Sequence, residues 1–268
     1  MTRKLLNIPY SKNLCEYRLL DLFIPEKPNE AGILFVHGGG WQGGRRDLWH
    51  PLMEYFASRG YLCASASYRL APHYIFPAAF EDIRLAMAWL QNNASSYGAD
   101  SAKIAAWGSS AGAHLCSLLG TVQPHENTGV TNELENRNTL PAAVVSYAGV
   151  YLLARNGMPP VLRDVTDKFL GGDELATEEK TKDASPLLHV CGKEPPFAIF
   201  VGEYDEVIPR FMHEQMVTKL KEYGTEVEFY IVKGMQHGLG YDVKSEIEKQ
   251  NTYIVENFLK HHLKPMRQ

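Results

Sequence analysis

The chain has 268 residues, of which 45% are hydrophobic and 22% are charged, and its formal net charge is −4. This composition is ordinary for a globular protein, and the lack of a basic excess argues against nucleic acid as a partner. No apolar run approaches the roughly 20 residues that a membrane-spanning helix needs, so no membrane partner is predicted. The length fits a single α/β domain over residues 1–268.

The N-terminus and the cysteines predict a cytoplasmic protein. The first ten residues include two basic side chains but no apolar segment or cleavage site of a secretory signal. The four cysteines are far apart and form no Cys-x-x-Cys pair, which favours free thiols in a reducing compartment. No cofactor motif and no metal-ligand spacing is present: no His follows His213 and Glu214 at the interval that a zinc motif needs.

Apolar runs and amphipathic stretches alternate along the chain. Two short strands are expected within residues 1–30, the clearer at 17–25, and further strands at 32–36, 61–68, 104–107, 142–148, 196–202 and 227–232. Helices are predicted at 47–59 (capped by Asp47), 78–92 (opened by Pro77), 113–121, 209–223 and 243–262. The polar segment 123–140 is predicted to be an exposed connection. Such alternation predicts a mostly parallel sheet with helices on both faces.

Residues 150–195 lose the strand pattern and contain Gly157-Met158-Pro159-Pro160. We expect this segment to be a small cap-like insertion over the open end of the sheet and not a second domain. Ligands of parallel α/β sheets bind beyond the carboxyl ends of the strands. Residues 37–41, Ser110, Asp205 and His237 all follow predicted strand ends, so we expect them to meet at one edge of the sheet.

Residues 108–112 form a Gly-x-Ser-x-Gly pattern between a predicted strand and a predicted helix. A sharp strand-to-helix turn of this kind exposes the hydroxyl of its central residue, here Ser110. The flanking glycines, Gly108 and Gly112, are needed because a side chain there would strike neighbouring main chain. The pattern occurs by chance in turns, but its strand and helix context favours Ser110 as a nucleophile.

A serine nucleophile needs a base and a group that orients the base. His237 lies in a glycine-flanked loop after the last strand, and Asp205 follows the strand before it. The chain order Ser, Asp, His is the one expected of this architecture. Glu203 and Glu206 are the alternative acids. His37 and His114 are predicted to be structural, with His37 ordering its glycine loop.

An acyl-transfer reaction also needs donors for an oxyanion. The glycines at 38–40 allow main chain to approach a substrate oxygen closely, and Ala111 begins a helix whose dipole favours negative charge. Trp41 is expected either to line the substrate pocket or simply to pack. Arg69 is predicted to be scaffold. Glu81 and Asp82 are adjacent on a helix and are expected to point apart, unlike the carboxylates of a glycosidase.

These pieces together resemble the α/β-hydrolase superfamily, and within it the hormone-sensitive-lipase-like esterases and the small carbohydrate-ester and formamidase-type hydrolases. The matching segments are His37-Gly38-Gly39-Gly40-Trp41, Tyr68-Arg69-Leu70-Ala71-Pro72, Phe76-Pro77-Ala78-Ala79 with Glu81-Asp82, Gly108-Ser109-Ser110-Ala111-Gly112, Gly202 with Asp205 and Pro209, and His237-Gly238. The resemblance implies an α/β-hydrolase fold. It also implies a triad of Ser110, Asp205 and His237, and an oxyanion hole formed by the N–H groups of Gly39, Gly40 and Ala111.

Two features depart from the lipase-like branch. Ser109 stands where that branch usually has aspartate, which is closer to the smaller relatives. Only 36 residues precede His37, too few for the N-terminal helical cap of many lipase-like members. Both features predict a more open site than in capped lipases.

The sequence therefore predicts a metal-free serine carboxylesterase for short-acyl esters, acting on a small-molecule ester as a monomer or homodimer. The modest loop lengths suggest a bulky alcohol part, such as an acetylated or feruloylated carbohydrate. An aryl formamidase or another amidase-type hydrolase with the same triad is the first alternative. A non-catalytic binding protein of the same fold is the second.

Overall fold

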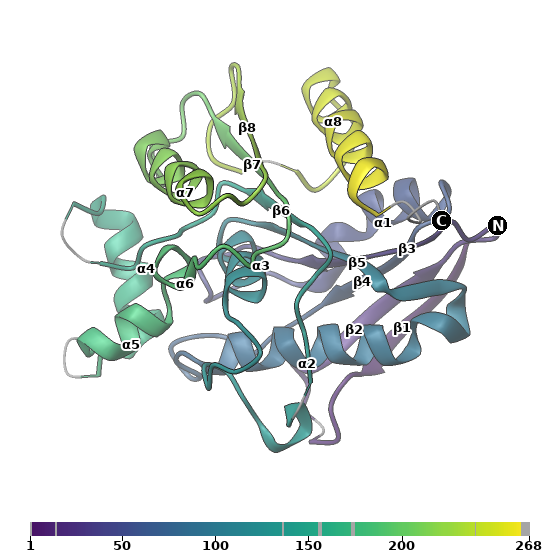
Figure 1. Cartoon of the computed structure of the whole chain (residues 1–268), viewed down its shortest axis with the longest axis horizontal. Helices are drawn as coiled ribbons and strands as arrows, with labels where there is room; N and C mark the ends of the chain where they lie inside the picture. Colours follow the sequence, from purple (N-terminus) through teal and green to yellow (C-terminus); the bar gives the residue numbers. More distant parts are fainter. Residues whose placement is uncertain are drawn as a thin grey trace.

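The computed structural model describes residues 2–13, 15–135, 137–154, 157–172, 175–238 and 240–263. In these ranges the chain forms one sheet in the order β1-β2-β4-β3-β5-β6-β7-β8 (Figure 1). The strands are β1 (Arg3–Pro9), β2 (Leu19–Ile24), β3 (Glu30–Val36), β4 (Leu62–Ala66), β5 (Ala99–Ser109), β6 (Val144–Tyr147), β7 (Phe197–Gly202) and β8 (Val227–Val232). The strands from β3 to β8 pair in parallel, and β2 pairs antiparallel with both β1 and β4.

Helices cover both faces of this sheet (Figure 1). The α-helices are α1 (His50–Ala57), α2 (Ala78–Asn93), α3 (Ala111–Thr121), α4 (Pro160–Leu170), α5 (Glu178–Asp183), α6 (Pro186–His189), α7 (Arg210–Glu222) and α8 (Glu246–His262), and the 3₁₀ turns are η1 (Arg46–Trp49), η2 (Ala94–Tyr97) and η3 (Asn132–Leu134). One apolar core joins α1 and α8 to the sheet, and a second joins α2, α3, α4 and α7 to its other face. Within the described ranges, no helix is long and apolar enough to cross a membrane. The strand order and the helices on both faces (Figure 1) confirm the predicted fold class, a mostly parallel α/β sheet.

The topology brings the predicted site residues to one edge. Because β3, β5, β6, β7 and β8 are parallel neighbours, their carboxyl ends lie side by side. The loops that follow β3, β5, β7 and β8 carry residues 37–41, Ser110, Asp205 and His237 respectively.

Several predicted boundaries differ from the structure. The helix expected at 47–59 is a 3₁₀ turn followed by α1, and no side-chain cap forms at its start, because Asp47 lies inside that turn. The strand expected at 104–107 begins earlier, at Ala99. The residues between Ala99 and Ile104 are mostly polar and exposed, so they lack the apolar pattern that predicts a buried strand. The last helix begins at Glu246, behind a capping box made by Ser245 and Glu248. The connection 123–140 is only partly exposed, as η3 buries Leu134.

A buried ion-pair network joins the N-terminal segment to α2. Asp82 is fully buried, and its carboxylate accepts hydrogen bonds from Arg18 Nε at 2.8 Å and from Arg69 Nε at 2.9 Å. Arg69 also donates to Glu81 at 2.7 Å and to the Ala78 carbonyl at 3.0 Å. The expectation that Glu81 and Asp82 point apart is wrong, because one nitrogen, Arg69 Nη2, donates to both carboxylates, at 2.7 Å to Glu81 and 2.9 Å to Asp82. Arg69 is scaffold, as predicted.

Three of the buried histidines are at most 1% exposed: His37, His114 and His213. Burial lowers the pKa of each imidazole from 6.5 to about 4, because water no longer solvates the charged form. All three are therefore neutral in the native protein near pH 7. The unfolded chain takes up protons on these side chains at a higher pH than the native protein does.

We predict that Asp82→Asn lowers the free energy of unfolding by about 3–5 kcal/mol, since it leaves two arginines beside a neutral group in a buried site. Urea denaturation measures this loss. Asp164→Asn, which breaks an exposed i,i+4 pair with Lys168, is the matched control and should cost less than about 1 kcal/mol. Equal losses in the two variants would contradict a structural role for the network.

We also predict that the free energy of unfolding falls as the pH is lowered from 6.5 towards 4. In this window the unfolded chain binds protons on the three histidines that the folded chain does not bind. His213→Phe should reduce the proton uptake on unfolding at pH 5 by about one proton. Denaturation at a series of pH values measures this slope. Ser101→Ala, which changes no ionisable group at an exposed position, should leave it unchanged.

Candidate active site

The nucleophile elbow is built by close contact between main-chain segments. β5 ends at Ser109 and α3 begins at Ala111, which leaves Ser110 between them with φ 53° and ψ −119°. A Cβ at Gly108 would lie 2.2 Å from the carbonyl oxygen of Gly112, and one at Gly112 would lie 2.1 Å from that of Val36. Neither position can hold a side chain, so both glycines are required by the turn.

Ser110, His237 and Asp205 form a continuous hydrogen-bonded chain. His237 Nε2 lies 3.0 Å from Ser110 Oγ, and His237 Nδ1 lies 2.9 Å from Asp205 Oδ2. The other carboxylate oxygen, Asp205 Oδ1, accepts the N–H groups of Val207 at 3.0 Å and Ile208 at 2.9 Å. The aspartate is thereby fixed in the orientation that holds the imidazole towards the serine.

Two opposing effects act on the pKa of Asp205. Burial raises this pKa, but the hydrogen bonds from His237 and from the Ile208 N–H outweigh burial and lower it below its ordinary value. The carboxylate is therefore ionised at neutral pH. An ionised Asp205 accepts a hydrogen bond from the Nδ1–H of His237, which leaves the unprotonated Nε2 free to accept the serine proton. Glu203 is not in this position, because its carboxylate accepts the Gly234 N–H at 2.9 Å.

The loop after β3 is a tight left-handed turn. Gly39, Gly40 and Trp41 all have positive φ, at 115°, 58° and 57°. The Gly39 carbonyl accepts the N–H groups of both Gln42 and Gly43 at 3.0 Å, which curls the loop back on itself. This geometry brings Gly39 and Gly40 to the wall of the same cavity as Ser110 and Ala111.

His37 holds the start of this loop. Its ring stacks on Tyr68 with centroids 4.3 Å apart, and its Nδ1 lies 2.8 Å from the Gly38 carbonyl oxygen. The Tyr68 hydroxyl donates to the His37 carbonyl at 2.9 Å. These contacts agree with the prediction that His37 orders the glycine loop.

Trp41 is locked between the loop and the insertion. Its indole N–H donates to His114 Nδ1 at 3.1 Å, and its ring stacks on Phe169 with centroids 4.4 Å apart. His114 Nε2 lies 2.7 Å from the Ala184 carbonyl, so this nitrogen carries the ring proton and Nδ1 accepts from the tryptophan. Trp41 is 1% exposed and also lies in the cavity wall, and contact between Trp41 and a substrate stays a prediction.

A cavity of about 420 Å³ lies beside Ser110. Its wall combines the glycine loop, the elbow and the His237 loop with a set of apolar side chains, namely Leu48, Val150, Val161, Leu162, Val165, Val207 and Ile208. The polar side chains in the described wall are Ser109, Ser110, His237 and Tyr241. The space offered to a ligand is thus apolar, with hydrogen-bonding groups gathered at one end.

The insertion expected at 150–195 contains α4, α5 and α6, and α4 and α5 lie together at one end of the molecule (Figure 1). Val161, Leu162 and Val165 of α4 line the cavity. Val165 packs against the glycine loop, since its Cγ1 lies 3.2 Å from the position of a Cβ at Gly40. Val161 is 64% exposed and Leu48 is 43% exposed, so they border the opening of the cavity.

Several lining residues carry no recognisable sequence pattern. Leu48, Val207 and Ile208 look like ordinary apolar residues near helix starts. Tyr241 lies four residues after His237, and its hydroxyl accepts the Gly38 N–H at 2.8 Å. A tyrosine in a loop has no motif that would single it out.

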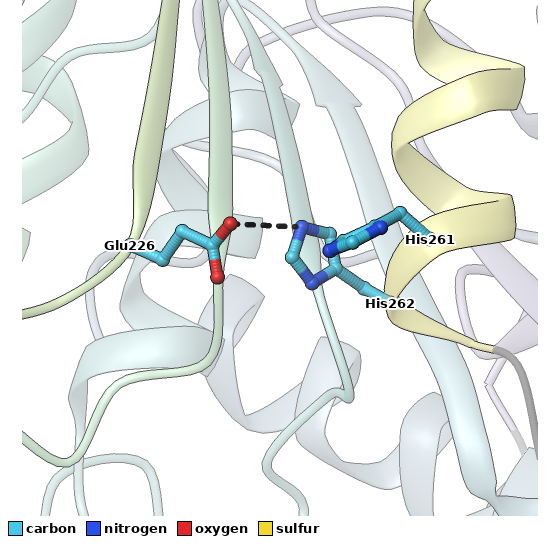
Figure 2. A group of neighbouring side chains, drawn as sticks. All are labelled: Glu226, His261 and His262. Carbon is cyan, nitrogen blue, oxygen red and sulfur yellow. Dashed lines mark ion pairs between the residues drawn. The ribbon is translucent and has the colours of Figure 1, made fainter. Parts of the chain in front are cut away.

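A second group of possible ligands lies away from the cavity. Glu226, His261 and His262 gather where β8 begins and α8 ends, and their potential ligand atoms lie within 4.8 Å of one another (Figure 2). Glu226 Oε1 and His262 Nε2 are 3.7 Å apart, a contact that is an ion pair when His262 is protonated. None of the three lines the cavity. We assign this cluster no part in the chemistry at Ser110.

Residues 20–220 match the family model described as BD-FAE. The chain is 31% identical over 238 residues to the probable carboxylic ester hydrolase LipM of Mycobacterium tuberculosis, which covers 85% of this chain and 54% of LipM. It is also 31% identical over 231 residues to esterase LipC of the same organism, covering 82% and 57%. The chain thus spans about half the length of these curated relatives.

Two solved structures show the same architecture. A thermophilic esterase of Thermogutta terrifontis with bound propionate is 26% identical with a TM-score of 0.78, covering 98% of this chain and 96% of that one. A truncated carbohydrate esterase from gut microbiota is 22% identical with a TM-score of 0.80, covering 97% and 96%. The second likeness concerns the fold alone.

Proposed function

The chain belongs to the BD-FAE family of the α/β-hydrolase superfamily, and we propose that it is a serine esterase with Ser110, His237 and Asp205 as its triad. One observation carries this proposal. The hydroxyl, imidazole and carboxylate are joined by hydrogen bonds of 3.0 and 2.9 Å at the wall of an apolar cavity. The named esterases among its relatives support the same activity.

In the first half of the reaction, Ser110 Oγ attacks the ester carbonyl carbon and His237 Nε2 takes its proton. The carbonyl oxygen becomes an oxyanion, stabilised by the N–H groups of Gly39, Gly40 and Ala111. Losing one such donor typically costs about 3 kcal/mol of transition-state stabilisation. Ala111 begins α3, so its N–H has no acceptor within the helix and is available to the substrate.

Collapse of the tetrahedral intermediate breaks the bond to the alcohol. The alcohol leaves with the proton held on His237, and the acyl group stays on Ser110 as an ester. In the second half, His237 takes a proton from water, and the resulting hydroxide attacks the acyl carbon. The carboxylic acid is released and Ser110 regains its proton. Asp205 remains ionised throughout and stabilises the imidazolium.

The cavity supports a short or flat apolar group as the part of the ester that is buried. Its described wall provides seven aliphatic side chains, whereas its polar side chains are gathered around Ser110. A sugar needs several hydrogen-bonding partners when it is buried. An acetylated or feruloylated carbohydrate therefore fits only with its sugar outside the apolar cavity and its acyl group inside. The Trp41 ring would contact the buried group.

We predict that aryl acetates and propionates are hydrolysed with a higher kcat/KM than acetylated xylo-oligosaccharides. The apolar wall binds an aryl or alkyl group but leaves the hydroxyls of a sugar unpaired. Initial rates on purified protein with matched acetyl esters measure the ratio. A clear preference for the sugar esters would contradict the apolar assignment. Hydrolysis of an N-formyl arylamine at a rate rivalling the acetates would instead support the aryl formamidase alternative.

We predict that Ser110→Ala lowers kcat by about 10⁶-fold and that Asp205→Asn lowers it by about 10⁴-fold. The first change removes the nucleophile, and the second leaves His237 with the wrong ring nitrogen protonated. Rates on an activated aryl ester measure both. Ser101→Ala, at an exposed serine of the same strand, is the control and should keep full activity.

A fluorophosphonate probe separates this proposal from a non-catalytic binding protein of the same fold. The wild-type chain should be labelled at Ser110 and the Ser110→Ala variant should not. Failure to label a folded wild-type protein, together with an absence of ester hydrolysis, would favour the binding protein.

A further inference from the structure

Tyr241 ties together the three segments that form the candidate active site. Its hydroxyl accepts the N–H of Gly38 at 2.8 Å, and it is also hydrogen-bonded to the side chain of Ser109. Gly38 belongs to the glycine loop after β3, Ser109 precedes the nucleophile, and Tyr241 itself follows His237. We propose that Tyr241 is a positioning residue that sets the oxyanion loop relative to Ser110 and His237. This inference rests on the proposed esterase function.

The His237 loop needs such a tie because it follows β8, the strand at the edge of the sheet. Most described residues between 233 and 238 are exposed, so little packing holds them. At the far end of the loop, Gly240 lies flat on Tyr147, where a Cβ would come within 2.3 Å of the ring. The Tyr241 hydroxyl adds a hydrogen bond to Gly38 in the loop after β3, on the other side of the site.

The hydrogen bond from the Gly38 N–H to Tyr241 holds the glycine loop directly before the proposed oxyanion donor Gly39. Gly38 is wedged in place, because a Cβ there would lie 2.7 Å from the Ser109 carbonyl oxygen and 3.0 Å from the Tyr241 hydroxyl. The next peptide along the chain carries the N–H of Gly39, one of the proposed oxyanion donors. Fixing the Gly38 N–H therefore limits the rotation of the donor that follows it. An oxyanion hole is effective only when its donors are held in place before the reaction.

The ring and the hydroxyl of Tyr241 have separate roles. The ring packs against Trp49 with centroids 4.8 Å apart, in the core beneath η1. Phenylalanine would keep this contact and remove only the hydrogen bonds. Burial raises the pKa of the Tyr241 hydroxyl, so it stays protonated across the working pH range and does not exchange protons with the substrate.

We predict that Tyr241→Phe lowers kcat about 10- to 100-fold and changes KM less than about 3-fold, because the oxyanion forms only after substrate binding. Its affinity for an aryl boronic acid, which mimics the tetrahedral intermediate, should fall by a factor similar to that for kcat. Its affinity for the carboxylate product should not. The pH dependence of kcat/KM should keep its shape, since the tyrosine transfers no proton.

Tyr10→Phe is the matched control. It removes another hydroxyl that is hydrogen-bonded to main chain: the Tyr10 hydroxyl donates to the Ser67 carbonyl at 2.8 Å, and Tyr10 does not line the cavity. It should lower stability but leave kcat and boronate affinity unchanged. If the two variants lose activity in proportion to their loss of stability, Tyr241 has only a structural role.

A double-mutant cycle with Ser109→Ala tests the bridge itself. Because both side chains act through one hydrogen-bonded unit, the combined loss in kcat should be smaller than the product of the single losses. Independent losses, or an unchanged kcat in Tyr241→Phe, would overturn the inference.

Hydrogen exchange gives a readout that does not require activity. In Tyr241→Phe the amide of Gly38 loses its acceptor, so peptides covering residues 36–44 should exchange faster than in wild type and in Tyr10→Phe. If these peptides exchange at the same rate in Tyr241→Phe as in wild type, the positioning role of Tyr241 is refuted, whether or not the protein is an esterase. A wild-type chain that exchanges as predicted but hydrolyses no ester would refute the proposed function and leave the tie intact.

Discussion

The candidate active site depends on how closely α3 approaches the end of β3. The main chain at Gly112 comes so near to Val36 and His37 that an added Cβ would lie 2.1 and 2.5 Å from their carbonyl oxygens. This contact bends the chain sharply at Ser110. It holds the φ and ψ angles of Ser110 in a region that residues other than glycine rarely adopt. The Ser110 N–H, which donates to the Tyr147 carbonyl at 2.7 Å, fixes the turn from the other side. The same approach places the serine beside the glycine loop.

Buried polar groups support this arrangement from outside the cavity. His114 accepts from Trp41 and is bonded to the Ala184 carbonyl, which joins the glycine loop to the insertion. Burial keeps this histidine neutral, with its pKa lowered to about 4, so its hydrogen bonds keep their direction near neutral pH. Val165 and Phe169 of α4 complete the joint by packing on Gly40 and Trp41. The helix α4 and the proposed oxyanion loop are thus packed directly against each other.

Local sequence patterns predict the elements well where one strong pattern fills the whole element. The apolar runs at β3, β6, β7 and β8 are examples, and so is the strand-turn-helix around Ser110. Local patterns do not predict element boundaries or side-chain directions that are set by contacts with distant parts of the chain. The strand β5 begins at Ala99, which pairs with Glu30 of β3, although the residues between Ala99 and Ile104 are mostly polar. Glu81 and Asp82 should diverge on a helix, but both carboxylates turn towards the same nitrogen of Arg69.

By itself, the sequence determined the fold class, the candidate nucleophile and the chain order of serine, aspartate and histidine. These follow from short-range rules: strand and helix periodicity, and glycines flanking one serine. Only the tertiary structure decided that His237 lies 3.0 Å from Ser110, that Tyr241 reaches Gly38, and that seven aliphatic side chains of the described residues lie in the cavity wall. The reason is physical. Those contacts join loops separated by up to about two hundred residues (Gly38 and Tyr241 are 203 apart), and a loop side chain takes its direction from the packing around it.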